Sequence, residues 1–199
     1  MIAQGKLFCA RYLPLVAETF PNNFKGVNPE QFYEAVNVSG PSLIRVEADE
    51  VTYPMHIILR YELEKGLFDG SIQVEHLPEM WNAKMKEYLG VEPPTDTLGV
   101  LQDTHWSGGA FGYFPSYTLG AIYASQFYQA LIRAEPGIEK QIEMGNLAPV
   151  REWLGIQIHQ QGRLLSVPAL VKRVTGENLN PDHFLDYLKN KYRQIYRLN

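Results

Sequence analysis

Cysteine and basic charge are both scarce in this 199-residue chain, and each scarcity excludes a class of protein. Cys9 is the single cysteine, so no disulfide can form within the chain, and a reducing, cytoplasmic compartment is predicted. The 18 Lys and Arg residues are outnumbered by 22 Asp and Glu residues, so no nucleic-acid partner is expected. No apolar run approaches the roughly 18 residues that a membrane span requires, so no membrane partner is expected either.

Sustained alternation of apolar and polar residues is nearly absent, whereas start signals of helices recur along the chain. Asn28-Pro29-Glu30-Gln31 combines an N-cap residue, a proline at the first helical position and a glutamine two positions later. The proline-rich loop at 91–99 is not read as a domain linker, because aromatic-rich sequence follows it at once. We therefore predict an all-α protein of about eight helices, with residues 1–199 in a single domain. Further helix starts are predicted at 77–79, 114–115, 148–149, 166–168 and 180–182.

The segment EADEVTYPMHIILRYELEKG, residues 47–66, is predicted to be mostly helical and to carry a polar stripe. At about 100° per residue, four polar side chains fall within about 60° of one another. These are Asp49, Tyr53, His56 and Arg60. Pro54 is expected to kink the helix and to free the carbonyl of Glu50. Two interpretations stay open: the stripe is the solvated face of an amphipathic helix, or the helix is buried and the stripe faces a cleft.

A second segment, LQDTHWSGGAFGYFPSYTLG at 101–120, combines five aromatic residues, four glycines and an Asp–His pair. Glycines permit positive φ angles and a close approach of the backbone. The Lys-Ser/Thr pair of a phosphate-binding loop is missing, and no second carboxylate for sugar hydrolysis lies nearby. His105 can donate a hydrogen bond to a substrate carbonyl or carboxylate. The alternative is a loop that is filled by its own aromatic side chains.

Signals of a metal site or of a catalytic nucleophile are negative in these 199 residues. The five histidines show neither an H-E-x-x-H motif nor a pair spaced four residues apart. No G-x-S-x-G sequence occurs, and Cys9 is expected to be a small buried apolar residue. We therefore predict no metal ligand in this chain.

The two segments together resemble two signature blocks of the thermostable zinc carboxypeptidases, the Taq-type metallocarboxypeptidase family. IRVEADEVTYPMHIILRYELE and LQDTHWSGGAFGYFPSYTLG stand in the family's order and at a similar separation. LPEMWNAKMKEYLGVEPP and LNPDHFLDYLKNKY are similar as well, so the resemblance runs from about Phe8 to the end of the sequence. It implies a mostly helical, usually dimeric enzyme that removes C-terminal amino acids from peptides with one zinc ion.

In that family the zinc ion is held by two histidines of H-E-x-x-H and by the glutamate of a following H-E-S-x motif. Neither motif occurs here, nor does the family's D-x-R-x-T block, so the resemblance is to the C-terminal part of such an enzyme. A catalytic zinc ion needs about three protein ligands and an activated water. The chain is therefore expected to be truncated, to bind no zinc itself, and to be inactive alone. The missing N-terminal part or a second copy of the chain is its expected partner.

The resemblance also assigns roles to particular residues of the predicted cleft. Arg45 is expected to pair with the terminal carboxylate of a peptide, and His105 to contact the scissile carbonyl in the transition state. Tyr113 or Tyr117 would supply another donor or line the pocket. Supporting roles are predicted for Asp49, Tyr53, His56, Arg60, Gln102, Asp103 and Trp106, with Asp103 orienting His105. Two alternatives remain: a non-catalytic helical module that binds peptide C-termini or a partner chain, and another enzyme class that uses Asp103 and His105.

Overall fold

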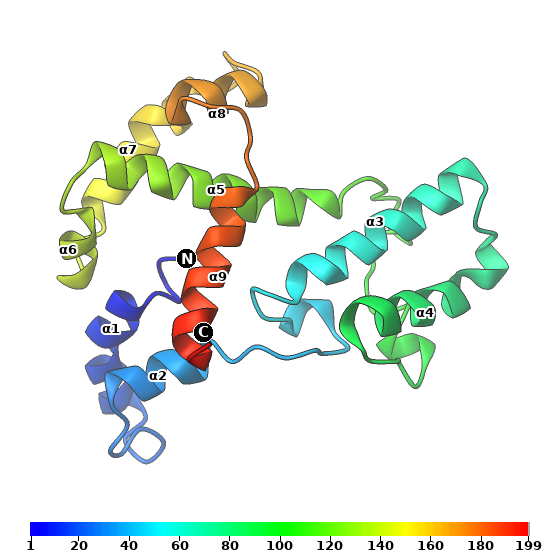
Figure 1. Cartoon of the computed structure of the whole chain (residues 1–199), viewed down its shortest axis with the longest axis horizontal. Coiled ribbons are helices and arrows are strands. Elements are labelled where there is room, and N and C mark those ends of the chain that lie inside the picture. The colour runs from blue at the N-terminus through cyan, green and yellow to red at the C-terminus, as the bar shows by residue number, and fades with distance from the viewer. Residues whose placement is uncertain (199) are drawn as a thin grey trace. The chain divides into compact units, whose positions relative to one another are not determined.

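The structure is a computed structural model that describes residues 1–198, and within that range it is helical and contains no strand (Figure 1). The predicted all-α class is confirmed, with nine α-helices in the described range where about eight were expected. None of these helices is long and apolar enough to cross a membrane. The α-helices are α1 (Lys6–Thr19), α2 (Pro29–Val36), α3 (Tyr53–Asp69), α4 (Leu77–Leu89), α5 (Pro115–Ala134), α6 (Ile138–Glu143), α7 (Ala148–Gln157), α8 (Val167–Thr175) and α9 (Asp182–Tyr196). Short 3-10 helices are η1 (Arg45–Glu47), η2 (Val74–His76), η3 (Asp96–Leu98) and η4 (His159–Gln161).

Contacts within the chain divide it into two compact units. The first unit contains residues 1–38 and the described part of 121–199, and the second contains residues 39–120. Helix α5 begins in the second unit and continues in the first. The loop at 91–99 lies inside the second unit, and the single domain expected from the sequence stays a prediction.

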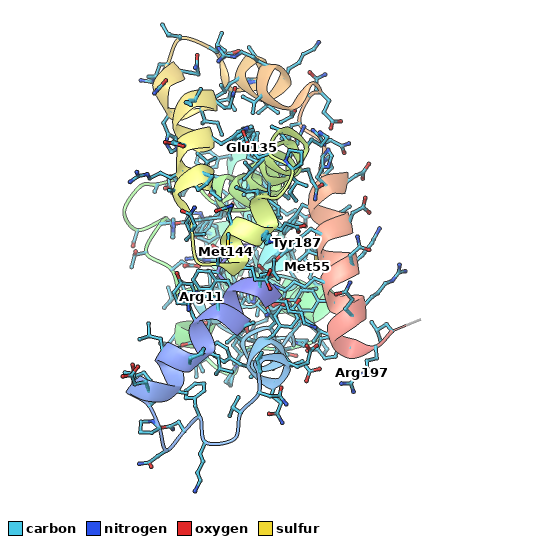
Figure 2. The ribbon with its side chains drawn as sticks, turned by 90° about the vertical axis from the view of Figure 1, so that its left-hand side faces the viewer. Arg11, Met55, Glu135, Met144, Tyr187 and Arg197 are labelled. Atoms are coloured by element: carbon cyan, nitrogen blue, oxygen red, sulfur yellow. The ribbon has the colours of Figure 1, made fainter. Side chains whose placement is uncertain are left out.

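The first unit is built around a cluster of buried apolar side chains. Within it, α1 packs against α2 and α6, and α6 packs against α7. Arg11 of α1 donates from Nε to the carbonyl oxygen of Met144, just after α6, at 3.4 Å, and both residues are labelled in Figure 2. The predicted start of α2 is confirmed, because Gln31 N donates to Asn28 Oδ1 at 2.9 Å and Asn28 N donates to Gln31 Oε1 at 3.0 Å. The buried cluster comprises Ala130, Leu131, Ile138, Ile142, Val150 and Trp153.

The second unit has its own apolar cluster, formed where α3 packs against α4. Helix α4 begins at Leu77, with Pro78 in its first turn, and ends at Gly90, whose φ of 70° places it in the left-handed region. Both ends agree with the prediction from the sequence. The cluster comprises Leu59, Leu63, Leu77, Trp81, Met85 and Leu89, and it anchors α3, the helix that carries Tyr53, His56 and Arg60 of the predicted site.

Helix α3 begins later than predicted, and this changes the role of Pro54. The helix starts at Tyr53, so Pro54 lies in its first turn, where its missing N–H would have had no helical partner. The expected kink is therefore wrong. Asp49 lies in the turn before the helix, where its carboxylate accepts from Thr52 N at 3.1 Å and from Thr52 Oγ1 at 2.8 Å. Asp49 thus holds the entry to α3 and is not part of a helical stripe.

Of the remaining stripe residues on α3, two are buried rather than solvated and Tyr53 is half-buried. His56 and Arg60 are both 0% exposed. Leu59 and Leu63 of the same helix are also fully buried in the apolar cluster. The interpretation of α3 as an amphipathic helix with a solvated polar face is therefore wrong, and its buried polar groups must find partners inside the protein.

Candidate functional site

The predicted site residues all lie in the second unit, on three stretches of chain. The first stretch is the turn from η1 to the start of α3, and the second is the buried side of α3. The third runs from the loop that follows η3 into the first turn of α5. Side chains that are up to 58 residues apart in sequence meet here through hydrogen bonds.

Two arginines share one carboxylate at the centre of this arrangement, which we call the Asp103 bridge (Arg45, Asp103 and Arg60). Arg45 donates to Asp103 Oδ1 from Nη2 at 2.7 Å and from Nε at 3.1 Å. Arg60 donates from Nε to Asp103 Oδ2 at 2.7 Å. The side chains of Arg45, Asp103 and Arg60 are 7%, 10% and 0% exposed. The bridge ties η1 and α3 to the loop that carries Asp103.

The charges of the Asp103 bridge follow from burial and from the short distances between its members. Burial raises the pKa of Asp103, but the hydrogen bonds from Arg45 and the charge of Arg60 outweigh it and hold that pKa below its ordinary value. Burial lowers the pKa of Arg60 to about 10, although Asp103 opposes this shift. At neutral pH the bridge therefore holds two positive charges and one negative charge.

All three nitrogens of the Arg45 guanidinium already donate to side chains, and only the second N–H of Nη1 and of Nη2 is left. Besides its bonds to Asp103, it donates from Nη1 to the Tyr53 hydroxyl at 2.8 Å. Its guanidinium carbon lies 5.0 Å from the centre of the Tyr117 ring. A peptide carboxylate would find only these two N–H groups, on a side chain that is 7% exposed. The role of Arg45 as a carboxylate ligand stays a prediction, and this geometry favours a positioning role.

Gln102 fixes the start of the loop through its side-chain amide. Its Oε1 accepts from the backbone N–H of Arg45 at 2.9 Å. Its Nε2 donates to the carbonyl oxygens of Leu43 at 3.0 Å and of Leu98 and Gly99 at 3.1 Å. Gln102 therefore joins η1 to the start of the loop, and its supporting role in a substrate site stays a prediction.

His105 lies between the Asp103 bridge and the aromatic residues at the start of α5. Its Nε2 and the Tyr117 hydroxyl share a hydrogen bond of 2.9 Å, and its ring packs on Phe114 with 4.3 Å between ring centres. Its Nδ1 is 3.9 Å from Asp103 Oδ1, which is too long for a hydrogen bond. Asp103 thus faces His105 without binding it, and its hydrogen bonds go to the arginines.

Tyr113 and Tyr117 differ in their exposure to solvent. Tyr113 is 51% exposed, whereas Tyr117 is half-buried. Their ring centres are 5.4 Å apart in an edge-to-face arrangement. The His105–Tyr117 hydrogen bond therefore lies beside an exposed aromatic residue, Tyr113.

Glu64 is a site residue that reading the sequence missed. Its carboxylate accepts from Trp106 Nε1 at 2.8 Å and from the backbone N–H of Gly112. Gly112 has a φ of 74°, a conformation that favours glycine. Glu64 lies one helical turn after Arg60, so its place on the buried face of α3 was a signal that could have identified it. It fixes the second half of the loop at residues 101–114, which we call the glycine-rich loop, and Asp103 fixes the first half.

His56 is the remaining polar residue of the buried face of α3. Neither of its ring nitrogens has a hydrogen-bond partner among the described residues. Burial and the charges of Arg60 and Arg45 lower its pKa to about 4, so it is neutral at physiological pH. His56 sits against the Asp103 bridge, and Arg60 donates from Nη1 to its carbonyl oxygen at 2.7 Å.

The zinc ion that the family resemblance implies finds no ligand set in the described part of this chain. No group of three or more His, Cys, Asp or Glu side chains among residues 1–198 is placed to hold a metal ion. The carboxylates of Asp103 and Glu64 are instead committed to hydrogen bonds within the site. We therefore derive no chemical step from a metal bound by these residues.

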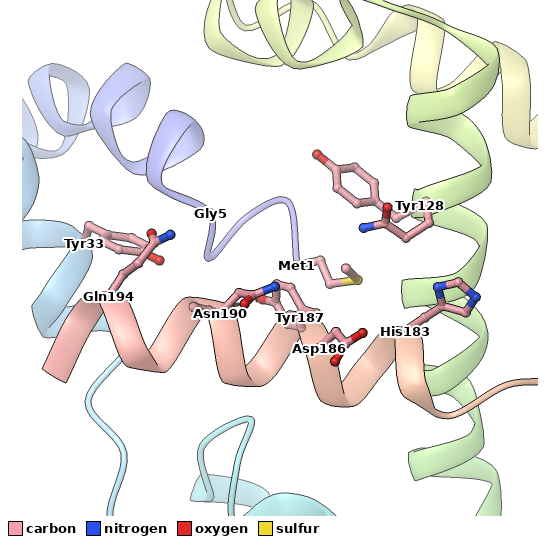
Figure 3. A pocket seen from close by; sticks show the side chains of 11 residues that line it. Met1, Gly5, Tyr33, Tyr128, His183, Asp186, Tyr187, Asn190 and Gln194 are labelled. Atoms are coloured by element: carbon pink, nitrogen blue, oxygen red, sulfur yellow. Dashed lines mark hydrogen bonds between the residues drawn. The ribbon is translucent and has the colours of Figure 1, made fainter. Parts of the chain in front are cut away.

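The first unit contains a separate cavity of about 470 Å³, to which none of the predicted site residues contributes. Side chains of α9, including Asp186, Asn190 and Gln194, line one side of it (Figure 3). Tyr33 of α2 and Tyr128 of α5 complete much of the remaining wall. Its lining mixes phenol, amide, carboxylate and ammonium groups without selecting one class of ligand.

Comparison with known protein families gives one match that spans almost the whole chain. Residues 1–192 match the family described as carboxypeptidase Taq (M32) metallopeptidase. The chain is 45% identical over 197 residues to Carboxypeptidase 1 of Bacillus subtilis. It is 47% identical over 197 residues to Thermostable carboxypeptidase 1 of Thermus thermophilus.

The chain covers only part of these relatives. The match to the Bacillus subtilis protein covers 99% of this chain but only 39% of that protein. The match to the Thermus thermophilus protein covers 98% of this chain but only 38% of that protein. Among solved structures, the M32 carboxypeptidase from Deinococcus radiodurans R1 superposes with a TM-score of 0.95 at 36% identity. That superposition covers 98% of this chain and 40% of the other. The helical arrangement described above is therefore that of a part of these longer proteins.

Proposed function

Because the chain belongs to the Taq-type (M32) metallocarboxypeptidase family, we propose that it forms the substrate-binding wall of a carboxypeptidase active site and supplies no metal ligand. In this proposal the zinc ion and its ligands come from polypeptide equivalent to the part of the relatives that these 199 residues do not span. The chain alone is inactive, and its substrate class is peptides with a free C-terminus.

The observation that carries this proposal is the hydrogen-bonded pair of His105 and Tyr117. Donors that are fixed before the reaction stabilise a developing oxyanion better than mobile groups, because they need no reorganisation. Packing on Phe114 fixes the His105 ring, and the Asp103 bridge fixes the loop that carries it. Because Tyr117 occupies Nε2 of His105, we assign the contact with the peptide carbonyl to the Tyr117 hydroxyl. His105 then acts as the residue that holds this hydroxyl in place.

Reconstitution of the active site tests the proposal. The 199-residue chain would be combined with the part of the Bacillus subtilis relative outside the matched region, and hydrolysis of a C-terminal residue from a short peptide would be measured with zinc. We expect activity from the mixture and none from either part alone. Tyr117→Phe should lower kcat by about 100-fold with little change in KM, since one oxyanion donor contributes about that much.

Tyr61→Phe is the matched control, because Tyr61 is a tyrosine of α3 that is 50% exposed and lies outside the site. It should leave kcat unchanged. Peptidase activity from the 199-residue chain alone would contradict the claim that it is inactive. A Tyr117→Phe mixture as active as the unaltered one would contradict the assigned role of the hydroxyl.

The non-catalytic alternative is distinguished by binding rather than by hydrolysis. The site is assembled within one unit from described residues, so the chain alone can be tested for binding of a peptide. Selective binding of a free-acid peptide over its C-terminal amide, without activity in any mixture, would support a peptide-binding module instead of a part of an enzyme.

A further inference from the structure

Helix α3 carries apolar side chains on the side that faces solvent as well as on the side that faces α4. Tyr61 and Phe68 are 50% and 70% exposed, and at about 100° per residue they point within about 20° of each other. Ile58 is 37% exposed and lies one turn before Tyr61. Leu59 and Leu63, on the side toward α4, are fully buried. A helix with apolar side chains on opposite sides is typical of the interior of a larger protein.

The glycine-rich loop extends this exposed surface through Phe111. The Phe111 ring meets the Phe68 ring edge to face, with 5.1 Å between ring centres, and Phe111 is itself 47% exposed. Glu64 fixes the backbone beside Phe111, because its carboxylate accepts from Gly112 N. We call the whole surface the apolar face (Ile58, Tyr61, Phe68 and Phe111). An exposed apolar surface that is held in shape before binding is typical of a protein interface.

We propose that the apolar face binds the polypeptide that supplies the zinc ligands, which is equivalent to the part of the relatives that this chain does not span. The inference rests on the proposed function and names the surface at which the two parts meet. The chain covers 39% of the Bacillus subtilis relative, so the greater part of a protein of that length lies outside the chain. The carbonyl bound by Tyr117 must also reach the zinc ion, so the polypeptide that holds the ion must approach the second unit next to the glycine-rich loop. Phe111 belongs to that loop and offers an apolar contact there.

The test measures binding separately from hydrolysis. The 199-residue chain would be coexpressed with an affinity-tagged polypeptide, the part of the Bacillus subtilis relative outside the matched region, and the chain retained on the tag would be measured without a peptide substrate. We expect retention of the unaltered chain, and retention at least tenfold weaker for Phe68→Ser and for Phe111→Ser, because a few aromatic residues contribute most of the binding energy of an interface. Both substitutions replace exposed side chains, so the melting temperature of the chain alone should change by no more than about 2 °C.

Phe20→Ser is the matched control, because Phe20 is a 55% exposed aromatic residue of the first unit, and it should be retained like the unaltered chain. Tyr61→Phe keeps its apolar ring and so leaves the apolar face intact. Equal retention of the three serine variants, whether full or lost, would overturn the proposal, and so would failure to retain the unaltered chain. A dimer of the chain alone that Phe68→Ser dissociates, measured by sedimentation, would assign the face to a second copy and overturn the proposal as well. Retention that depends on Phe68 and Phe111, without hydrolysis in any mixture, would contradict the proposed function and support this interface.

Discussion

His56 shows at the scale of one residue how a charged neighbourhood can hold a titratable group neutral. The imidazole is fully buried on α3 and lies against two arginines, and both facts penalise its protonated form. The nearby carboxylates of Asp103 and Asp49 oppose the shift, but their effects are smaller. A neutral His56 therefore adds no positive charge beside the two arginines.

This neutrality predicts a pH dependence of stability between pH 6.5 and 4. The pKa of His56 falls from 6.5 in the unfolded chain to about 4 in the folded one, so only the unfolded chain takes up the proton in that window. Stability is therefore fully present above pH 6.5 and is lost as the pH falls, by about 3 kcal/mol near pH 4. Urea unfolding at several pH values would measure this loss.

His56→Gln is the variant that isolates the effect, because glutamine is polar and similar in size but does not titrate. Its stability should vary less between pH 6.5 and 4 than that of the unaltered chain. The lowered pKa values of Asp49 and Asp103 make these carboxylates lose stability as well, mostly at the acid end of this window and below it, and both proteins share that contribution. Parallel pH profiles of the two proteins would show that His56 is not the source of the slope.

At the scale of elements, α3 is constrained along its whole length. Its first turn follows the Asp49 turn, its middle contacts the Asp103 bridge, and its later part holds the loop through Glu64. Near its end, a Cβ added at Gly66 would lie 2.5 Å from Ile72 Cδ1 and 2.7 Å from Ile72 Cγ1. Gly66 thus leaves room for the Ile72 side chain, which would have to shift to accept a Cβ at this position.

Two helical glycines are therefore expected to respond in opposite ways to alanine. Gly66→Ala should lower the free energy of unfolding by about 1 kcal/mol, because the clash with Ile72 outweighs the gain in helix propensity. Gly155→Ala in α7 should raise it by about 0.5–1 kcal/mol, because no atom lies within 4 Å of the added Cβ. Chemical denaturation of both variants measures the difference.

A double-mutant cycle identifies the cause of the Gly66 effect. In an Ile72→Ala background, where the clashing atoms are absent, Gly66→Ala should no longer destabilise the protein. A destabilisation of the same size in both backgrounds would place the cause elsewhere in the helix.

The helices that could be predicted from the sequence are those that begin with a capping residue or a proline. The starts of α2, α4 and α5 follow from Asn28-Pro29, Leu77-Pro78 and Phe114-Pro115, because caps and prolines act locally. Helix α1 was not predicted: Gly5 at its N-cap makes no side-chain hydrogen bond and Pro14 lies inside it. Burial of Cys9 and Leu13 is what supports α1, and such tertiary packing leaves no local signal.

The residues that form the site were more predictable from the sequence than the hydrogen bonds that join them. Periodicity placed His56 and Arg60 on one face of α3, and the composition of residues 101–120 marked the loop. The bonds from Asp103 to Arg45 and Arg60 span 58 and 43 residues, and no repeat or periodic pattern relates positions so far apart. That is why Asp103 was assigned to His105, its neighbour in sequence, while its hydrogen bonds go to the arginines.

At the scale of the whole chain, the two units differ in what holds each together. The first is built on the apolar cluster around Trp153, and the second combines an apolar cluster around Trp81 with the Asp103 bridge. A substitution in the Asp103 bridge should therefore destabilise the second unit more than the first.

Asp103→Asn tests this, because it removes the carboxylate that two buried arginines share. Breaking a buried ion pair from one side costs about 3–5 kcal/mol, so amide hydrogens of the second unit should exchange at least about 100-fold faster. Hydrogen exchange read by mass spectrometry reports each unit by its own peptides. Amides of residues 121–198 should keep most of their protection.

Glu92→Gln is the control, since it removes a carboxylate from an exposed ion pair with Lys86 at 3.3 Å. It should change exchange very little in either unit. Equal loss of protection in both units of Asp103→Asn would mean that the chain unfolds as one cooperative domain, which is the organisation predicted from the sequence.

The glycine-rich loop could not be transferred to another protein by itself, although it is a continuous stretch of the sequence. Its two anchors are a carboxylate of its own, Asp103, and a carboxylate of α3, Glu64. A graft of residues 101–114 onto another helical scaffold would carry the first anchor without its arginines and would lack the second entirely. A recipient would also need Arg45, Arg60 and Glu64 in the same relative positions, so the smallest unit that can be moved between proteins is the loop together with η1 and α3.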